Sequence, residues 1–311
     1  MQIFNFSQSV NFMRFKWPAV MLSVLLVLGS LGSIATKGIN WGLDFTGGTV
    51  IEVGLSQSAD LTQIRQTLAA AGYADAVIQL FGSSKDVLIR IPLRADIEQA
   101  TVGESVLQAL NAELTEPVNM RRVEFVGPSV GEELKQDGGL AMLVALIGIL
   151  LYVAMRFEWR LSVGAVASLA HDVVLTVGLF SILQLEFDLT VLAAILALIG
   201  YSINDTIVVF DRIRESFRKL RDASVDDTIN HAITSTLNRT VITSLTTILV
   251  LLVLFFMGGA LIHGFATALL FGIAVGTYSS VYVASAIAEI LGISRADMLP
   301  PVAAEAETDN S

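Results

Sequence analysis

Residues 196–215 read LALIGYSINDTIVVFDRIRE, and this stretch decides how the rest of the chain is interpreted. It begins as an apolar helix of the type that crosses membranes, carries Asn204 and Asp205 side by side, and then becomes a charged run. A carboxylate inside a bilayer costs about 3 kcal/mol or more, so an ionisable residue at that depth indicates a functional site. We therefore interpret the chain as membrane machinery arranged around Asp205.

The composition is that of a protein with several membrane spans. Hydrophobic residues make up 54% of the 311 residues, charged residues only 15%, and mean hydropathy is +0.69. A soluble domain is typically about a quarter charged. The net charge of −10 argues against nucleic acid as a partner. The absence of cysteine excludes disulfides, thiolate catalysis and cysteine metal sites, and no other pattern predicts a metal or a cofactor.

Six apolar runs are each close to or beyond the roughly 20 residues that cross a bilayer as a helix. They cover 18–36, 138–156, 161–183, 189–210, 240–258 and 264–291. The first resembles a signal peptide, but its apolar run exceeds the roughly 7–15 residues of a signal core, so we expect a retained helix. The sequence thus predicts an α-helical polytopic membrane protein with six transmembrane helices.

The charges in the short connections predict the orientation of these helices. Basic residues precede the first span and fill 157–160 and 211–239, whereas 184–188 carries acids and no base. Both termini should therefore face the cytoplasm. We expect a cytoplasmic N-terminal segment 1–17, an external segment 37–137, a cytoplasmic loop 211–239 between helices of the 138–291 bundle, and a disordered cytoplasmic tail 292–311.

The external segment is expected to fold as a small α+β domain. Its strand and helix patterns follow the order β-α-β-β-α-β, which is typical of a ferredoxin-like fold. The strands are expected at 49–55, 76–81, 86–91 and 119–126, and the helices at 60–72 and 95–114. Ser129 and Glu132 fit a capping box, which predicts a separate short helix over 127–137. No nucleophile lies near a base, so we expect a binding or mechanical module rather than an enzyme.

Polar residues near Asp205 are candidate partners of its carboxyl group. Tyr201 and Ser202 lie one turn before it and are available as hydrogen-bond donors. A hydroxyl stripe opens the fifth span directly after Arg239; its members are Thr240, Thr243, Ser244 and Thr247. Such a stripe commonly joins helices by hydrogen bonds. Together with Arg239 and Asp205 near the same leaflet, it also fits a hydrated polar path.

The third and sixth spans carry further unusual residues. His171 and Asp172 lie near the middle of the third span, and neighbouring helix positions point about 100° apart, so the two should not share one face. Asp172 is either a proton-relay group or a structural polar group, and we interpret His171 as structural. A seam of small residues in the sixth span predicts close helix packing, with a neighbouring subunit as one candidate partner. The seam consists of Gly264, Ala268, Gly272 and Gly276.

Five motifs together carry a family resemblance. They are GLDFTGG at 42–48, VGPSVG at 126–131, GYSINDT at 200–206, FDR at 210–212 and NRT at 238–240. With them, nearly the whole chain resembles the SecF branch of the bacterial SecDF protein-export family, within the resistance-nodulation-division (RND) transporter superfamily. The signature that follows the first span consists here of Asp44, Phe45, Thr46, Gly47 and Gly48.

The resemblance implies a function and a set of partners. Members of this family pair six helices with six from SecD and use the proton motive force to promote preprotein translocation through SecYEG across the bacterial inner membrane, and insertion into it. The expected partners are SecD, SecYEG, YidC, YajC, the translocating preprotein and the lipid bilayer. No cofactor and no enzymatic activity are implied. Asp205 and Arg239 match proton-relay residues of the family, and Asn204 lies beside them.

Three other interpretations remain possible from the residues alone. Asp172 and Asp205 could form the pair of an intramembrane aspartyl protease, but Asp205 lies in YSIND rather than in a protease-type GxGD motif. The chain could be a self-contained RND-type exporter of small molecules or lipids, which would need to homodimerise. It could also be a structural scaffold, although buried charges would then cost stability without a function.

Overall fold

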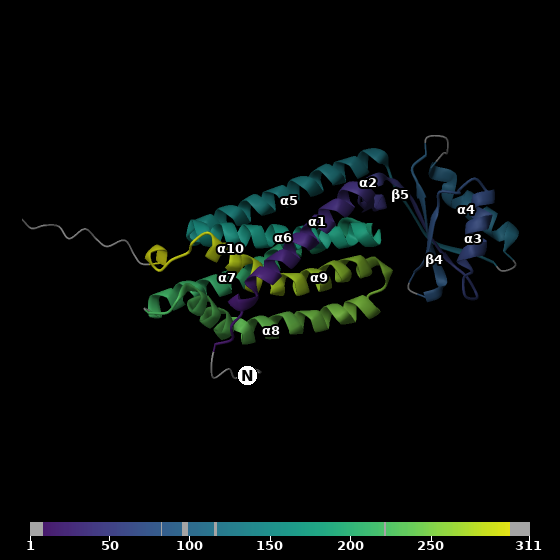
Figure 1. The fold of residues 1–311 in the computed structure, drawn as a ribbon. Coiled ribbons are helices and arrows are strands. Elements are labelled where there is room, and N and C mark those ends of the chain that lie inside the picture. Colours follow the sequence, from purple (N-terminus) through teal and green to yellow (C-terminus); the bar gives the residue numbers. More distant parts are fainter. Residues whose placement is uncertain (1–8, 82, 95–98, 115–116, 221, 299–311) are drawn as a thin grey trace, which may run out of the picture.

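Six helices in the described part of the chain are long and apolar enough to cross a membrane. The computed structural model describes residues 9–81, 83–94, 99–114, 117–220 and 222–298. The first helix follows a short turn, η1 (Met13–Phe15). The helices are α1 (Lys16–Lys37), α5 (Pro128–Arg156), α6 (Trp159–Leu183), α7 (Leu189–Lys219), α8 (Val225–Met257), and α9 (Ala260–Ser279), which continues through the π-helical turn η2 (Ser280–Ala284) into α10 (Ser285–Ile290). They form one bundle with an α+β unit at one end (Figure 1).

The α+β unit has the predicted order of strands and helices. It comprises β2 (Gly48–Gly54), α3 (Leu61–Ala70), β3 (Val77–Phe81), β4 (Ser83–Pro92), α4 (Gln99–Glu113) and β5 (Asn119–Val126). The strands form an antiparallel sheet in the order β3-β4-β2-β5. Asp60 caps α3 as expected, since its carboxylate accepts from the Thr62 and Gln63 amides. Gly82 and residues 95–98, where a turn and a helix start were expected, lie outside the described residues.

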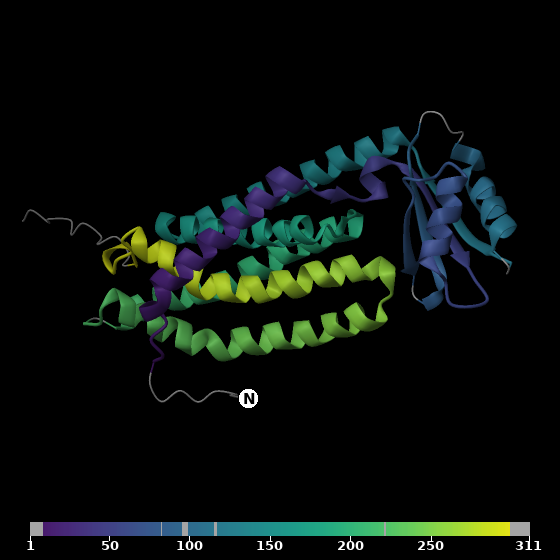
Figure 2. The same ribbon diagram turned by 45° about the vertical axis from the view of Figure 1, so that its right-hand side comes forward.

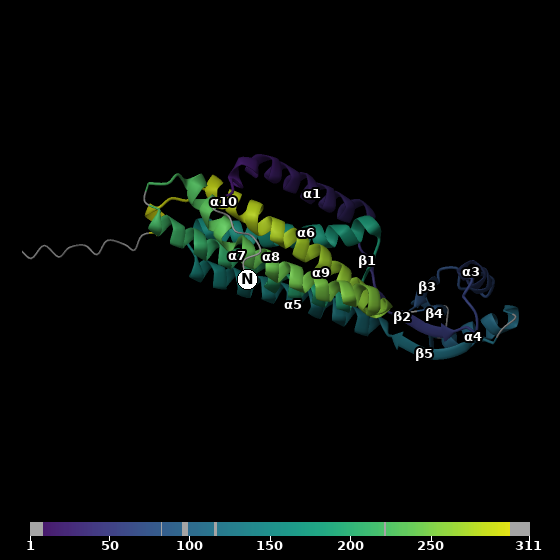
Figure 3. The same cartoon turned by 90° about the horizontal axis from the view of Figure 1, so that it is seen from below.

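The helices α6, α7 and α9 form the centre of the bundle. Their facing side chains build a core that includes Phe180, Leu198 and Ile273. By contrast, α1, α5 and α8 expose large apolar side chains such as Met21, Leu25 and Val250, as expected for helices that face lipid or a partner. Figure 3 shows α1 along one side of the bundle and α5 along the other.

The small-residue seam of the sixth span packs inside the chain and not against a neighbouring subunit. A β-carbon added at Gly264 would lie 2.9 Å from Val191, and one at Gly272 would lie 2.4 Å from Leu198 Cδ2. Both contacted side chains belong to α7. The missing side chains therefore allow α9 to approach α7 closely.

Two expected boundaries differ from the structure. The segment 127–137 is not a separate helix, because α5 runs without a break from Pro128, with Gly127 as its N-cap and no side-chain cap from Ser129. The loop expected over 211–239 is mostly helical, and only 220–224 separates α7 from α8. The charged run continues α7 because Glu215 bonds both Arg212 and Lys219 at helical spacing.

Part of the expected disordered tail is folded. Residues 292–298 lead into a short turn, η3 (Ala296–Met298), which buries Met298. Asp297 pairs with Arg160 at the start of α6. Hydrogen bonds from Ser294 and the charge of Arg160 hold the pKa of the Asp297 carboxyl below its ordinary value. Residues 299–311 of that tail lie outside the described residues.

Replacing Gly272 with Ala is expected to loosen the packing of α9 on α7. The added methyl group would overlap the fully buried Leu198 side chain at 2.4 Å. Overpacking of this kind destabilises by about 1–3 kcal/mol. Gly200→Ala is the matched control, because a β-carbon there meets nothing within 4 Å. Thermal unfolding of the purified proteins in detergent measures the difference, and equal melting temperatures for the two variants would contradict the packing argument.

Candidate functional site

Asp205 lies where three helical segments meet. It belongs to α7, and its side chain is buried. Thr240 of α8 donates to Oδ1 at 2.7 Å, and Ser280 of η2 donates to Oδ2 at 2.8 Å. Both donors are neutral hydroxyls, so no ion pair in contact compensates a charge on this carboxyl group within the described chain. A carboxyl group in such a place is far cheaper to bury when it binds a proton.

Arg239 lies next to this site without touching the Asp205 carboxyl. It precedes Thr240 on α8, is exposed, and lines a surface cavity of about 480 Å³ together with Asp211, Arg212 and Glu215. Its positive charge acts on Asp205 through space. The guanidinium is therefore placed to respond to the charge of Asp205 while it remains open to a partner or to water.

The expected partners within α7 do not contact Asp205. Ser202 donates instead to Asp172 on α6, at 2.5 Å. The Tyr201 hydroxyl is buried and has no hydrogen-bond partner in the described part of the chain. Asn204 is exposed on the outer side of α7. The proposal of Tyr201 and Ser202 as donors to Asp205 was therefore wrong, because the helix turns them toward other neighbours.

The hydroxyl stripe of α8 divides into two sets. Thr240 and Ser244 face the bundle, where Thr240 bonds Asp205 and Ser244 bonds Thr277 of α9 at 2.8 Å. Thr243 and Thr247 instead donate to carbonyl groups of their own helix, and Thr243 is exposed. Thr240 and Ser244 thus join helices within the chain by hydrogen bonds, whereas Thr243 lies on the surface one turn from Arg239.

Asp172 forms a second buried carboxyl site on α6. It is fully buried, and its Oδ2 accepts from Ser202 at 2.5 Å and from Ser279 at 2.8 Å. Its Oδ1 lies 2.9 Å from His171 Nδ1, so the two neighbours do contact each other, although they were expected to face apart. Asp172 and Asp205 therefore occupy separate hydrogen-bonded sites, each with its own donors.

The sequence analysis missed Ser279 and Ser280, which donate to Asp172 and Asp205 respectively. The signal was available as two adjacent hydroxyls within the apolar sixth span. Their placement depends on the π-helical turn, which the pattern of apolar residues does not reveal. Such turns occur frequently at functional sites.

The signature after the first span joins the α+β unit to the bundle. Asp44 lies on the short helix α2 (Leu43–Thr46), and its carboxylate accepts from the Leu189 amide at 3.0 Å, at the start of α7. Phe45 packs on Trp41 with ring centroids 5.4 Å apart. Thr46 Oγ1 donates to the carbonyl of Gly42. The motif thus holds the start of α7.

The backbone conformation favours glycine at the last two positions of this signature. Gly47 and Gly48 have φ of +73° and +136°, which L side chains rarely adopt. A β-carbon at Gly48 would also lie 2.5 Å from the carbonyl oxygen of Ile91. The chain therefore turns from α2 into the sheet at a point where no other residue fits.

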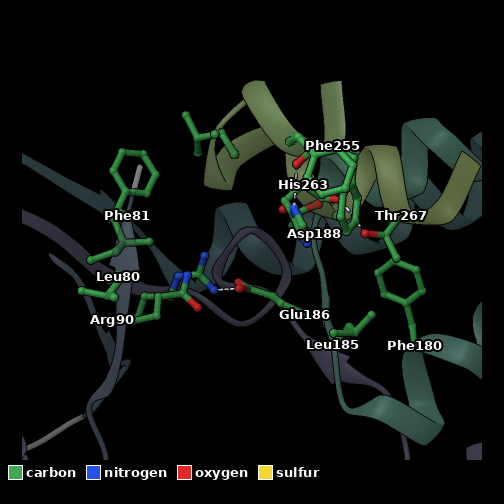
Figure 4. A pocket seen from close by; sticks show the side chains of 16 residues that line it. Leu80, Phe81, Arg90, Phe180, Leu185, Glu186, Asp188, Phe255, His263 and Thr267 are labelled. Carbon is green, nitrogen blue, oxygen red and sulfur yellow. Dashed lines mark hydrogen bonds and ion pairs between the residues drawn. The ribbon is translucent and has the colours of Figure 1, made fainter. Parts of the chain in front are cut away.

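A second connection between the unit and the bundle lies beside a cavity of about 430 Å³ (Figure 4). Strand β1 (Asn40–Trp41) pairs in parallel with β6 (Glu186–Phe187), just before α7. Arg90 of β4 forms an ion pair with Glu186. Burial lowers the pKa of Arg90, and the carboxylates of Asp188 and Asp44 act in the opposite direction. The unit lies beyond the end of the helices that carries these contacts (Figure 2).

The described residues contain no group of three His, Cys, Asp or Glu side chains that could hold a metal ion. For an aspartyl protease the two carboxyl groups would have to share a proton. Instead, Asp172 and Asp205 are held by different donors, and the protease interpretation finds no support in this geometry.

Comparison with known proteins gives consistent matches. The family described as "Protein export membrane protein SecD/SecF, C-terminal" matches residues 106–293, and "SecD/SecF GG Motif" matches residues 32–59. Protein translocase subunit SecF of Vibrio alginolyticus is 54% identical over 96% of this chain and 95% of its own length. The SecF subunit of Pseudomonas aeruginosa is 48% identical over 97% of each chain.

A solved structure has the same fold. The crystal structure of SecDF, a translocon-associated membrane protein from Thermus thermophilus, superposes with a TM-score of 0.81 at 39% identity. The match covers 92% of this chain but only 39% of the SecDF chain, so the present chain corresponds to part of that molecule. These relatives give no support to a small-molecule exporter. The chain is a multi-pass membrane protein that belongs to the SecF family of protein translocase subunits.

Proposed function

We propose that this chain, together with SecD, uses the proton motive force to promote preprotein translocation through SecYEG and insertion into the inner membrane. Membership of the SecF family supports the role in protein export. The observation that carries the energy coupling is the Asp205 site, a buried carboxyl group held by two hydroxyls with an arginine nearby but not in contact. The chain acts as an auxiliary subunit without covalent chemistry of its own.

The surface that takes SecD is formed by α7 and α8. Asn204, Arg239 and Thr243 are exposed there, on helices that are long and apolar enough to cross a membrane. Polar side chains at membrane depth normally face a bundle interior or a cavity, so a partner should cover them. The Thermus SecDF chain is longer than this one and has room for a second set of helices. We assign an acidic partner residue from SecD to Arg239, and YidC and YajC are further candidate associates.

We place the bundle in the inner membrane and the α+β unit in the periplasm. Basic residues collect at one end of the helices, including Arg156, Arg160 and Arg212, whereas Glu186 and Asp188 lie at the other end. This charge asymmetry favours a cytoplasmic position for the basic end and for both termini.

The antiparallel order β3-β4-β2-β5 and the order of the helices support a ferredoxin-like fold of the periplasmic domain.

In this mechanism, a proton from the periplasmic side neutralises Asp205. Its attraction to Arg239 disappears, and the hydrogen bonds to Thr240 and Ser280 weaken because a neutral acceptor replaces an anion. The helices α7, α8 and η2 then rearrange, and the periplasmic domain follows because Asp44 and β1 are attached at the start of α7. One charge that crosses the membrane provides about 2.3 kcal/mol per 100 mV, which shifts a two-state equilibrium about 50-fold.

Reconstitution tests this function. Vesicles that contain SecYEG, SecD and this chain are compared with vesicles that lack the chain. Both receive the SecA motor and a preprotein, and both are measured in the presence and absence of a proton gradient. The gradient should accelerate preprotein movement only where the chain is present, and an uncoupler should remove the acceleration. Equal acceleration without the chain would show that it does not couple the gradient to export.

A further inference from the structure

The pair of His171 and Asp172 has no role in the mechanism above, yet it is the most deeply buried ionisable cluster of α6. Asp172 is fully buried and His171 is 6% exposed. Oδ2 of Asp172 accepts two serine hydroxyls, and Oδ1 meets His171 Nδ1 at 2.9 Å. A carboxylate with neutral donors alone would leave a net charge in the bundle, and that charge is expensive. A proton on the pair makes its net charge zero.

The far side of the imidazole lies beside a cavity lined by α1, η2 and α10. Nε2 of His171 is buried and has no hydrogen-bond partner in the described part of the chain. The ring lines a cavity of about 220 Å³ beside α1, with Val20, Val24 and Val283 among the other lining residues. This volume exceeds the roughly 30 Å³ that one water molecule occupies in the liquid. Apart from His171, Ser23 is the polar side chain among the described lining residues, so Nε2 and the Ser23 hydroxyl are the groups that a water molecule would need as partners there.

The pair is also connected to the Asp205 site through one short segment. Ser279 donates to Asp172, and the next residue, Ser280, donates to Asp205. Ser280 begins the π-helical turn η2, so both hydroxyls depend on the same local backbone. A change in the charge of either carboxyl group alters the strength of its serine hydrogen bond. It therefore acts on the backbone that positions the other serine.

We propose that His171 and Asp172 form a second proton-binding site, which exchanges one proton through His171 Nε2 and is coupled to Asp205 through Ser279 and Ser280. When Nε2 accepts a proton, Nδ1 passes its own proton to Asp172 Oδ1, and the pair gains one positive charge. The surrounding titratable groups are Tyr278 and Tyr282 of the last span and Asp205 of α7. The inference deepens the proposed function, but its first readout does not depend on export.

Infrared difference spectroscopy of the purified complex with SecD, in lipid, tests this proposal directly. The stretching band of protonated carboxyl groups is followed as pH rises. Among the steps by which the wild-type complex loses this band, one should be absent in Asp172→Asn and a different one in Asp205→Asn. His171→Gln should shift the Asp172 step, because glutamine keeps a donor but cannot take up a proton. Thr176→Val is the matched control, since this buried hydroxyl bonds only the backbone carbonyl of Asp172.

The outcomes separate this inference from the proposed function. If Asp172→Asn leaves the titration unchanged, or if Thr176→Val alters it equally, Asp172 is a structural group and the inference is wrong. If the Asp172 step is present but no step belongs to Asp205, the energy-coupling role of Asp205 fails while the second site stands. Coupling between the two sites requires in addition that Asp172→Asn shift the pH at which the Asp205 step occurs. The same substitution made together with Ser279→Ala should give a smaller shift. An unchanged shift in Ser279→Ala would overturn the connection through the serines.

Discussion

Cells whose only copy of this protein carries Asp205→Asn should accumulate unprocessed secretory precursors. Asparagine has nearly the same shape as aspartate, and its carbonyl oxygen still accepts from Thr240 or Ser280. The variant therefore keeps the packing of the three helical segments but can no longer alternate between a charged and a neutral state. We expect it to lose the proton-driven acceleration, because it can no longer use the bias of about 50-fold per 100 mV that one coupled charge gives to a two-state equilibrium.

The measurement compares precursor levels with those in cells treated with an uncoupler, at equal amounts of the protein in the membrane. The variant should resemble uncoupled wild-type cells, and the uncoupler should have little further effect on it. Asp226→Asn is the matched control, because Asp226 lies on α8 but is 46% exposed and pairs with Lys16. Its loss should cost at most about 1 kcal/mol and leave export intact. Normal secretion by the Asp205 variant would remove this residue from the coupling mechanism.

Gly48→Ala should weaken the attachment of the α+β unit to the bundle. A side chain at φ +136° costs about 1–3 kcal/mol of backbone strain. The new methyl group would also lie 2.4 Å from Leu43 Cδ2 and 2.5 Å from the Ile91 carbonyl oxygen. The carbonyl belongs to the β2–β4 pairing and cannot move away without breaking the sheet. Strain and overlap together should exceed about 3 kcal/mol.

Gly72→Ala separates these two contributions. Gly72 also has a positive φ, +91°, but a β-carbon there meets nothing within 4 Å. The Gly72 variant should therefore show the strain alone, and the Gly48 variant should be considerably less stable. Limited proteolysis of the α+β unit and thermal unfolding of the whole protein measure both. If the two variants lose the same stability, the close contact at Gly48 has no energetic importance.

The membrane helices could be predicted because their signal is local. Each span needs only a run of apolar residues, and all six appear where the sequence placed them. The extent of α7 and α8 beyond the apolar runs was missed, because helix formation in 211–219 and 225–239 depends on charged pairs and on buried positions such as Ile213 and Phe217. Hydropathy does not report such pairs.

The donors of the buried carboxyl groups were harder to predict than the carboxyl groups themselves. An acid in an apolar span is visible in the sequence, whereas its partner is determined by the rotation of neighbouring helices. Ser202 was assigned to Asp205 by proximity in sequence, but the close approach of α6 and α7 gives it to Asp172. Thr240 was recognised as a polar neighbour because the stripe after Arg239 has helical spacing. Ser280 required knowledge of the π-helical turn.

Because the sheet is attached to the start of α7, a small tilt of this helix would produce a larger displacement of the sheet. Leu189, held by Asp44, is sixteen residues from Asp205, or about 24 Å along a helix with a rise of about 1.5 Å per residue. A rigid tilt of about 10° around the carboxyl group would move that end by about 4 Å, and the sheet would travel with it. A displacement of this size approaches the spacing of about 4.8 Å between strands. A hydrogen-bond change deep in the bilayer would thus become a stroke on the scale of one polypeptide chain's width.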